Sequence, residues 1–228
     1  MNVEYGEAWV YESIVGAIPG LNLSDRAAVT IQLIGFEFAV LLGALYYDLW
    51  YAAAFGTVAV GVAAVGSAVM LRFSQRLRAL DPPDAYRTAL FGSSFEVVLG
   101  LVAFLVLVTY LFVYDPRTAS LSLVERLFGP EPPLLVVFLA LLIAWDVAYR
   151  IGTSWWASVV AVWRSYTFEF DDGTALAYRQ LDLLNIGFAA IQLALLPFVW
   201  DRPVLAAALV GHVVATGGAV ALSTALLR

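Results

Sequence analysis

The chain contains no cysteine and no lysine, and it has few charged residues of any kind. Without cysteine there can be no disulfide, no thiolate metal site and no cysteine nucleophile. All twelve basic residues are arginine, which excludes a Walker-type phosphate loop and a Schiff base to pyridoxal phosphate or retinal, because each of these needs a lysine. Charged residues make up 13% of the 228 residues, against roughly 25% in soluble proteins.

Apolar residues take the place of the missing charges. They account for 62% of the chain, and the mean hydropathy is +0.87. Since soluble domains are roughly 45–50% apolar, this composition indicates an all-α, multi-pass integral membrane protein that has the lipid bilayer as its main partner. The net charge of −6 argues against a nucleic-acid partner, which would require a basic surface.

The absence of lysine, the acidic surplus and the abundance of alanine, valine and glycine together resemble the composition of membrane proteins from salt-loving archaea. The resemblance extends over the whole chain but includes no motif of a characterised family. It implies a halophilic archaeal source and a location in the cell membrane. It implies no catalytic residue and no cofactor.

The first 26 residues differ from the rest of the chain. They begin with acidic rather than basic residues, so they do not match a secretory signal peptide. Apolar residues recur at helical spacing among three glutamates, and Pro19 and Gly20 follow. This pattern predicts a short amphipathic helix at the membrane interface over residues 1–26. Residues 27–228 are predicted to form a single transmembrane helical bundle.

Apolar runs long enough to cross a bilayer, about 20 residues each, begin near residues 27, 51, 88, 183 and 204. A sixth apolar stretch covers residues 133–164 and is longer than one crossing requires. It contains either two short spans, which gives seven spans in all, or one long span, which gives six.

Two observations favour different span counts. The segments around Asp48 and Asp146 share an aspartate, a tyrosine three residues later and a following Gly-Thr pair, which indicates a weak 3+3+1 internal repeat and seven spans. The arginines favour six, because most of them then lie on one side, which is the cytoplasmic side by the positive-inside rule. We predict seven spans, with six as the alternative. The N-terminus and the 72–87 loop are predicted to be cytoplasmic.

Two predicted spans carry small residues four positions apart. Such stripes let helix backbones approach closely in lipid. They predict helix-packing faces, within this bundle or between copies of the chain, at Gly56, Ala59, Ala63 and Ser67 and at Ala207, Gly211, Ala215 and Ala219.

Polar and ionisable side chains interrupt the apolar runs. Such residues are costly in a bilayer and tend to face protein or water. Asp146 and Arg150 are four residues apart, so they share a helix face and can pair. With a single histidine and no cysteine, no metal site is predicted. We predict that one polar seam inside the bundle contains Glu37, Glu96, Asp146, Arg150, His212 and Gln192.

This seam suggests a transporter or channel for protons or small cations. The alternative is a scaffold or partner subunit without transport activity, in which the polar groups only hold helices together, either in a homo-oligomer or beside another membrane protein. An intramembrane lipid-modifying enzyme is the third alternative, and no catalytic residue is predicted for it. The transport hypothesis requires the polar side chains to converge on a shared cavity.

Overall fold

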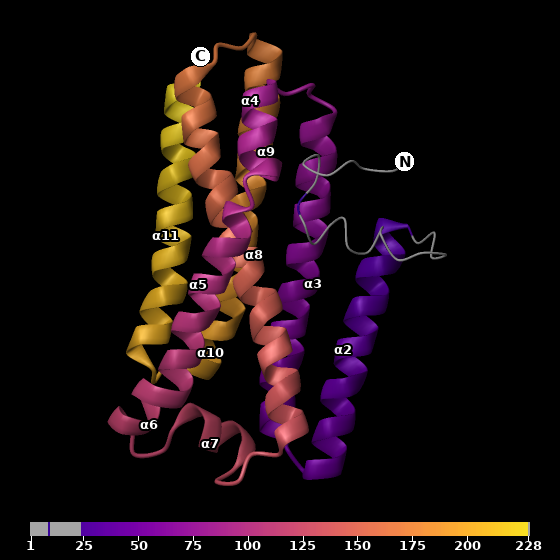
Figure 1. Ribbon diagram of the computed structural model, residues 1–228, viewed down its shortest axis with the longest axis vertical. Coiled ribbons are helices and arrows are strands. Elements are labelled where there is room, and N and C mark those ends of the chain that lie inside the picture. Colours follow the sequence, from indigo (N-terminus) through magenta and orange to yellow (C-terminus); the bar gives the residue numbers. More distant parts are fainter. Residues whose placement is uncertain (1–8, 10–23, 228) are drawn as a thin grey trace.

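The computed structural model describes Trp9 and residues 24–227, and every regular element among them is helical (Figure 1). The helix predicted over residues 1–26 lies almost entirely outside the described residues and stays a prediction. From that segment the structure describes Trp9 and residues 24–26, where α2 (Asp25–Tyr47) begins. The Trp9 ring is buried, with its centroid 5.5 Å from that of Phe73 and 5.2 Å from that of Phe91.

In the described part of the chain, six helical segments are long and apolar enough to cross a bilayer. Two of them are interrupted: α4 (Asp84–Arg87) leads through a π-helical turn, η1 (Thr88–Gly92), into α5 (Phe95–Thr109), and α9 (Asp172–Ile191) continues through η3 (Gln192–Leu195) into α10 (Leu196–Val199). The other four are α2 (Asp25–Tyr47), α3 (Trp50–Arg78), α8 (Leu134–Thr167) and α11 (Pro203–Leu226). By length and composition the chain is therefore a multi-pass membrane protein.

The predicted count of seven spans is wrong, and the alternative of six is correct for the described residues. The stretch that the seven-span prediction divides into two short spans is one continuous helix of 34 residues, α8. Thr153 supports that helix, since its hydroxyl donates a hydrogen bond to the Tyr149 carbonyl at 2.9 Å. Gly152 does not form a turn; it lies where α8 crosses α5, close to the backbone of Gly100. The 3+3+1 repeat required a boundary inside α8, so it is wrong as well.

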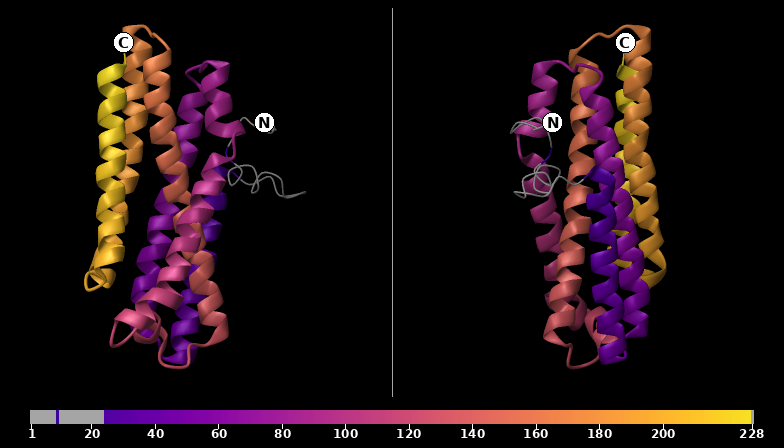
Figure 2. Two further views of the ribbon diagram at one scale, coloured as in Figure 1. Left: turned by 60° about the vertical axis from the view of Figure 1, so that its left-hand side comes forward. Right: turned by 90° about the vertical axis from the view of Figure 1, so that its right-hand side faces the viewer.

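Helix α8 lies at the centre of the bundle. Helices α5, α11, α3 and α9 pack around it, and α2 packs mainly against α3 (Figures 1 and 2). The chain alternates between the two ends of the bundle. One end contains the α2–α3 turn, a π-helical turn η2 (Tyr110–Tyr114) and the short helices α6 (Asp115–Thr118) and α7 (Leu123–Phe128). The C-terminal end of α11 lies at the other.

The first span begins and ends where the sequence indicates. The Ser24 hydroxyl accepts a hydrogen bond from the Ala27 N–H at 3.3 Å and so caps α2. Asp48 ends the helix in the left-handed region, at φ 56°, which aspartate tolerates better than most residues. The turn between α2 and α3 is therefore formed without glycine or proline.

Candidate functional site

A cavity of about 530 Å³ occupies the half of the bundle next to α7. Its wall is formed by parts of α2, α3, α5, η2, α8 and α11, together with the segment from Gln192 to Val199. Its volume falls within the range of roughly 300–1,000 Å³ typical of small-molecule sites. Nearly all the side chains that line it are aliphatic or aromatic; the polar exceptions are Tyr110, Gln192 and His212.

Helix α7 closes the cavity at the end of the bundle, where its residues Leu123, Leu127 and Phe128 form part of the wall. A capping box starts this short helix: the Ser122 hydroxyl accepts from the Glu125 N–H, and the Glu125 carboxylate accepts from the Ser122 N–H. The hydrogen bonds that the Ser122 N–H and hydroxyl donate to the Glu125 carboxylate lower the pKa of Glu125.

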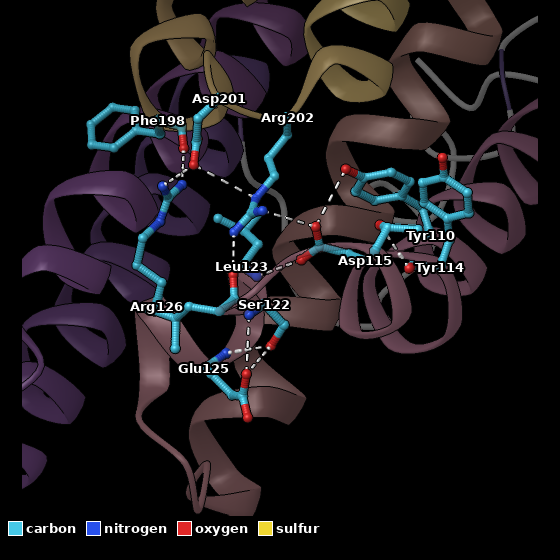
Figure 3. A network of polar contacts seen from close by, with 12 residues as sticks. Tyr110, Tyr114, Asp115, Ser122, Leu123, Glu125, Arg126, Phe198, Asp201 and Arg202 are labelled. Carbon is cyan, nitrogen blue, oxygen red and sulfur yellow. Dashed lines mark hydrogen bonds and ion pairs between the residues drawn. The ribbon is translucent and has the colours of Figure 1, made fainter.

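Two arginines fasten α7 to neighbouring segments (Figure 3). Arg126 donates to the Asp201 carboxylate at 2.6 Å and to the Phe198 carbonyl at 2.7 Å. Arg202 donates to the Leu121 carbonyl at 2.6 Å and pairs with buried Asp115 at 3.3 Å. The hydrogen bond from Arg126 lowers the pKa of Asp201. We call the Arg126 and Arg202 contacts the α7 tether.

Some residues of the cavity wall are exposed on the outside of the bundle. Val106 of α5 and Val204 of α11 both line the cavity, and their side chains are 63% and 49% exposed. Ala208, one turn further along α11, is also exposed and also lines the cavity. For a bundle of this composition, that exposed side faces the lipid chains.

Two of the predicted seam residues, Gln192 and His212, line this cavity. Gln192 lies in the 3₁₀ turn η3 and is fully buried, and neither its amide nitrogen nor its amide oxygen has a hydrogen-bond partner among the described residues. The Nε2 atom of His212, on α11, is likewise buried without a described partner. Tyr110 differs, because its hydroxyl donates to Asp115 at 3.5 Å.

Asp146 and Arg150 form the ion pair that their spacing predicted. The Arg150 guanidinium donates to the Asp146 carboxylate at 2.7 Å, and Gln32 of α2 donates to the second carboxylate oxygen at 3.0 Å. Both charged side chains are almost fully buried. A small cavity of about 10 Å³ lies beside Gln32 and Asp146, which is room for about one water molecule. This pair does not line the large cavity.

The two glutamates lie elsewhere, and neither lines one of these two cavities. Glu37 accepts a hydrogen bond from the Thr57 hydroxyl at 2.8 Å, between α2 and α3. Glu96 is fully buried on α5, and its carboxyl oxygens have no partner among the described residues. Its backbone lies against Gly152, on a face of α8 different from that of Asp146 and Arg150. The six predicted seam residues thus lie in four separate environments.

Sequence reasoning missed the most deeply buried ion pair. Arg164 near the end of α8 donates to both carboxylate oxygens of Asp182 on α9, at 2.8 and 3.2 Å, and both side chains are completely buried. Ser223 of α11 also donates to Asp182, and the Arg164 guanidinium lies over the Tyr178 ring. The helical spacing of Tyr178, Asp182 and Asn185 was the available signal, since all three face the interior.

The two small-residue stripes have different positions. On α3, Ala63 and Ser67 are buried, and a Cβ atom on Gly56 would lie 3.2 Å from Val40 of α2. Gly56 and Ala59 also line the large cavity, and the packing role of the whole α3 stripe stays a prediction. On α11, Ala207, Gly211 and Ala215 are exposed, and Gly211 has no atom near its Cβ position. The buried face of α11 contains Thr216, Val220 and Ser223 instead. Packing of the α11 stripe against another copy stays a prediction.

Comparison with known proteins gives one match. Residues 4–224 match the sequence model of DUF7530, a family of unknown function. No curated protein and no solved structure matches the chain.

Proposed function

We propose that this chain, which belongs to the DUF7530 family of unknown function, binds a lipophilic molecule within the membrane. The observation that carries the proposal is the 530 Å³ cavity with its almost entirely apolar wall. An apolar molecule in such a cavity gains van der Waals contacts with the side chains of the wall. Val106 and Val204 both line the cavity and are exposed on the outside of the bundle, which supports exchange of the molecule with the surrounding lipid.

The same wall makes a hydrated cation a poor occupant. An ion in an apolar environment loses its hydration, and it needs opposite charges or many oxygen ligands in compensation. No aspartate, glutamate or arginine lines the large cavity among the described residues. A transport function for this cavity would therefore concern an apolar cargo.

A pair of substitutions on α3 tests the proposal. Ala59 lines the cavity, whereas Ala54 is exposed and does not. Ala59→Phe should fill part of the cavity and reduce binding at least tenfold, and Ala54→Phe should leave binding unchanged. Binding is measured by native mass spectrometry of delipidated protein offered hexadecanol, hexadecane or palmitate. The proposal fails if no compound binds to wild type, or if both variants bind like wild type.

Transport of protons or small cations is the second candidate function. It is supported by the buried Asp146–Arg150 pair beside the small cavity at Gln32, because buried ionisable groups in membrane spans commonly belong to proton or ion paths. Proton or sodium flux into proteoliposomes should then be lost in Asp146→Asn. Wild-type vesicles without flux would count against this candidate and leave the first untouched.

A further inference from the structure

We infer that the molecule in the large cavity carries a neutral hydrogen-bonding group, a hydroxyl or a ketone-type carbonyl, which binds at Gln192 and His212 while its apolar part extends towards α7. The inference rests on the proposed function and adds the chemical class of the ligand. Two of the three polar side chains in the cavity wall have buried polar atoms without a hydrogen-bond partner among the described residues.

The first polar group is the buried amide of Gln192. Its side chain is completely buried in the cavity wall, yet its Nε2 and Oε1 atoms have no hydrogen-bond partner among the described residues. A buried amide without partners is costly, and such groups are usually satisfied by protein, water or ligand. A glutamine offers two donors and one acceptor, so this amide can bind a carbonyl, a hydroxyl or both.

His212 adds a second polar group from another helix. Its buried Nε2 atom also has no partner among the described residues, and its side chain lines the same cavity from α11. A neutral imidazole nitrogen either donates or accepts. We infer that both side chains bind the same ligand group, to which they offer both kinds of hydrogen bond. The third polar side chain, Tyr110, already donates to Asp115.

The lack of charge selects among ligand head groups. Because no aspartate, glutamate or arginine lines this cavity in the described part of the chain, a carboxylate or phosphate there would be buried without a counter-charge. Burying such an unpaired ion costs several kcal/mol or more. A neutral alcohol or ketone meets the amide and the imidazole at no such cost, and a plain hydrocarbon leaves both of them unsatisfied.

The binding assay above separates these classes when the three compounds are compared. Hexadecanol should bind wild type more tightly than hexadecane, and palmitate should bind least at neutral pH. Gln192→Leu keeps the volume apolar and should weaken hexadecanol about tenfold, the loss expected for one to two hydrogen bonds. It should leave hexadecane unchanged or tighter. Asn185→Leu removes a buried amide that does not line the cavity, and it should not change the ranking.

The outcomes distinguish the two proposals. If no compound binds, the proposed function fails. If all three compounds bind equally and Gln192→Leu changes none of the affinities, the cavity binds lipophilic molecules without selecting a polar group. This inference then fails, and the proposed function stands. Strong palmitate binding that Gln192→Leu leaves intact would also overturn it. A melting temperature of Gln192→Leu at or above that of wild type shows that weakened binding does not come from misfolding.

Discussion

Gly152 of α8 lies against Gly100 of α5 so closely that a Cβ atom on Gly152 would come within 2.5 Å of the Gly100 nitrogen and 2.9 Å of the Glu96 carbonyl oxygen. The two helix backbones therefore touch at this crossing. In lipid, where helix association depends on packing rather than on hydrophobic burial, such close contact between small residues is a main source of stability.

Gly152→Ala should separate α5 from α8. The new methyl group would meet backbone atoms, which cannot rotate away, so we expect a loss of about 1–3 kcal/mol in the free energy of unfolding. The measurement is a denaturant titration in detergent followed by circular dichroism. Gly218→Ala on α11 is the control, because nothing lies near its Cβ position. It should be neutral or stabilise the helix by up to about 1 kcal/mol. Equal free energies of unfolding for Gly152→Ala and Gly218→Ala would show that close contact at Gly152 does not stabilise the bundle.

Arg164→Leu should be among the most destabilising changes in the chain. It leaves the Asp182 carboxylate buried without its partner, which typically costs about 3–5 kcal/mol. The double variant Arg164→Leu with Asp182→Leu should recover part of that loss, because no unpaired charge then remains. Arg87→Leu is the matched control: it breaks the exposed Arg87–Asp84 pair and should cost at most about 1 kcal/mol. The prediction is refuted if Arg164→Leu lowers the free energy of unfolding no more than Arg87→Leu does.

Gly66→Ala should disturb the Asp146–Arg150 pair. A Cβ atom at this position of α3 would lie 2.5 Å from Arg150 Cδ and 2.6 Å from the Phe188 ring. Because both neighbours are buried, we expect a loss of about 1–3 kcal/mol, seen as a lower melting temperature in detergent. Gly61→Ala lies on the same helix with nothing near its Cβ position. If it lowers the melting temperature equally, the effect belongs to α3 and not to the ion pair.

Acid should loosen the α7 tether. The pKa of Asp201 is lowered by its hydrogen bond from Arg126, so the ionised carboxylate favours the tethered state. That contribution is fully present above the ordinary pKa of 3.8 and is lost as the pH falls through the lower value of the folded protein. A spin label at Leu121→Cys, the only cysteine in the variant chain, should become more mobile as the pH drops below 3.8.

Two variants show which acid is responsible. Asp201→Asn should give a more mobile label already at neutral pH, with a flatter response to acid. The pKa of Glu125 is also lowered, by its hydrogen bonds with Ser122, so Glu125→Gln tests the capping box separately. If the acid response persists in Asp201→Asn and disappears in Glu125→Gln, the capping box and not the tether is the sensitive element.

Local features of the fold were predictable because they depend on neighbouring residues. Helix spacing paired Asp146 with Arg150, and the length of the first apolar run required the turn at Asp48. The central stretch was misjudged because a shared Asp, Tyr and Gly-Thr pattern was interpreted as a repeat. In the structure Gly152 belongs to a helix crossing, and a crossing partner such as Gly100 cannot be identified from one sequence.

The candidate site was predictable only in part for a similar reason. Gln192 and His212 were identified as polar residues in apolar spans, but their common cavity depends on how η3 and α11 are placed. In the six-span alternative, Arg164 counts among the arginines on the cytoplasmic side by the positive-inside rule, which gives no sign of an ion pair. Its burial with Asp182 becomes evident only when α8, α9 and α11 are seen together, since that contact joins three segments distant in the chain.

The position of α7 and the exposed residues of the cavity wall bear on how the proposed ligand would reach its site. Helix α7 lies across the end of the bundle, and Val106 and Val204 of the wall are exposed where we expect lipid chains, so we expect the ligand to enter from the membrane, and a molecule dissolved in water to partition into lipid first. Occupancy should then follow the mole fraction of the ligand in the bilayer, so diluting proteoliposomes with buffer would leave it unchanged, whereas adding empty lipid vesicles would lower it.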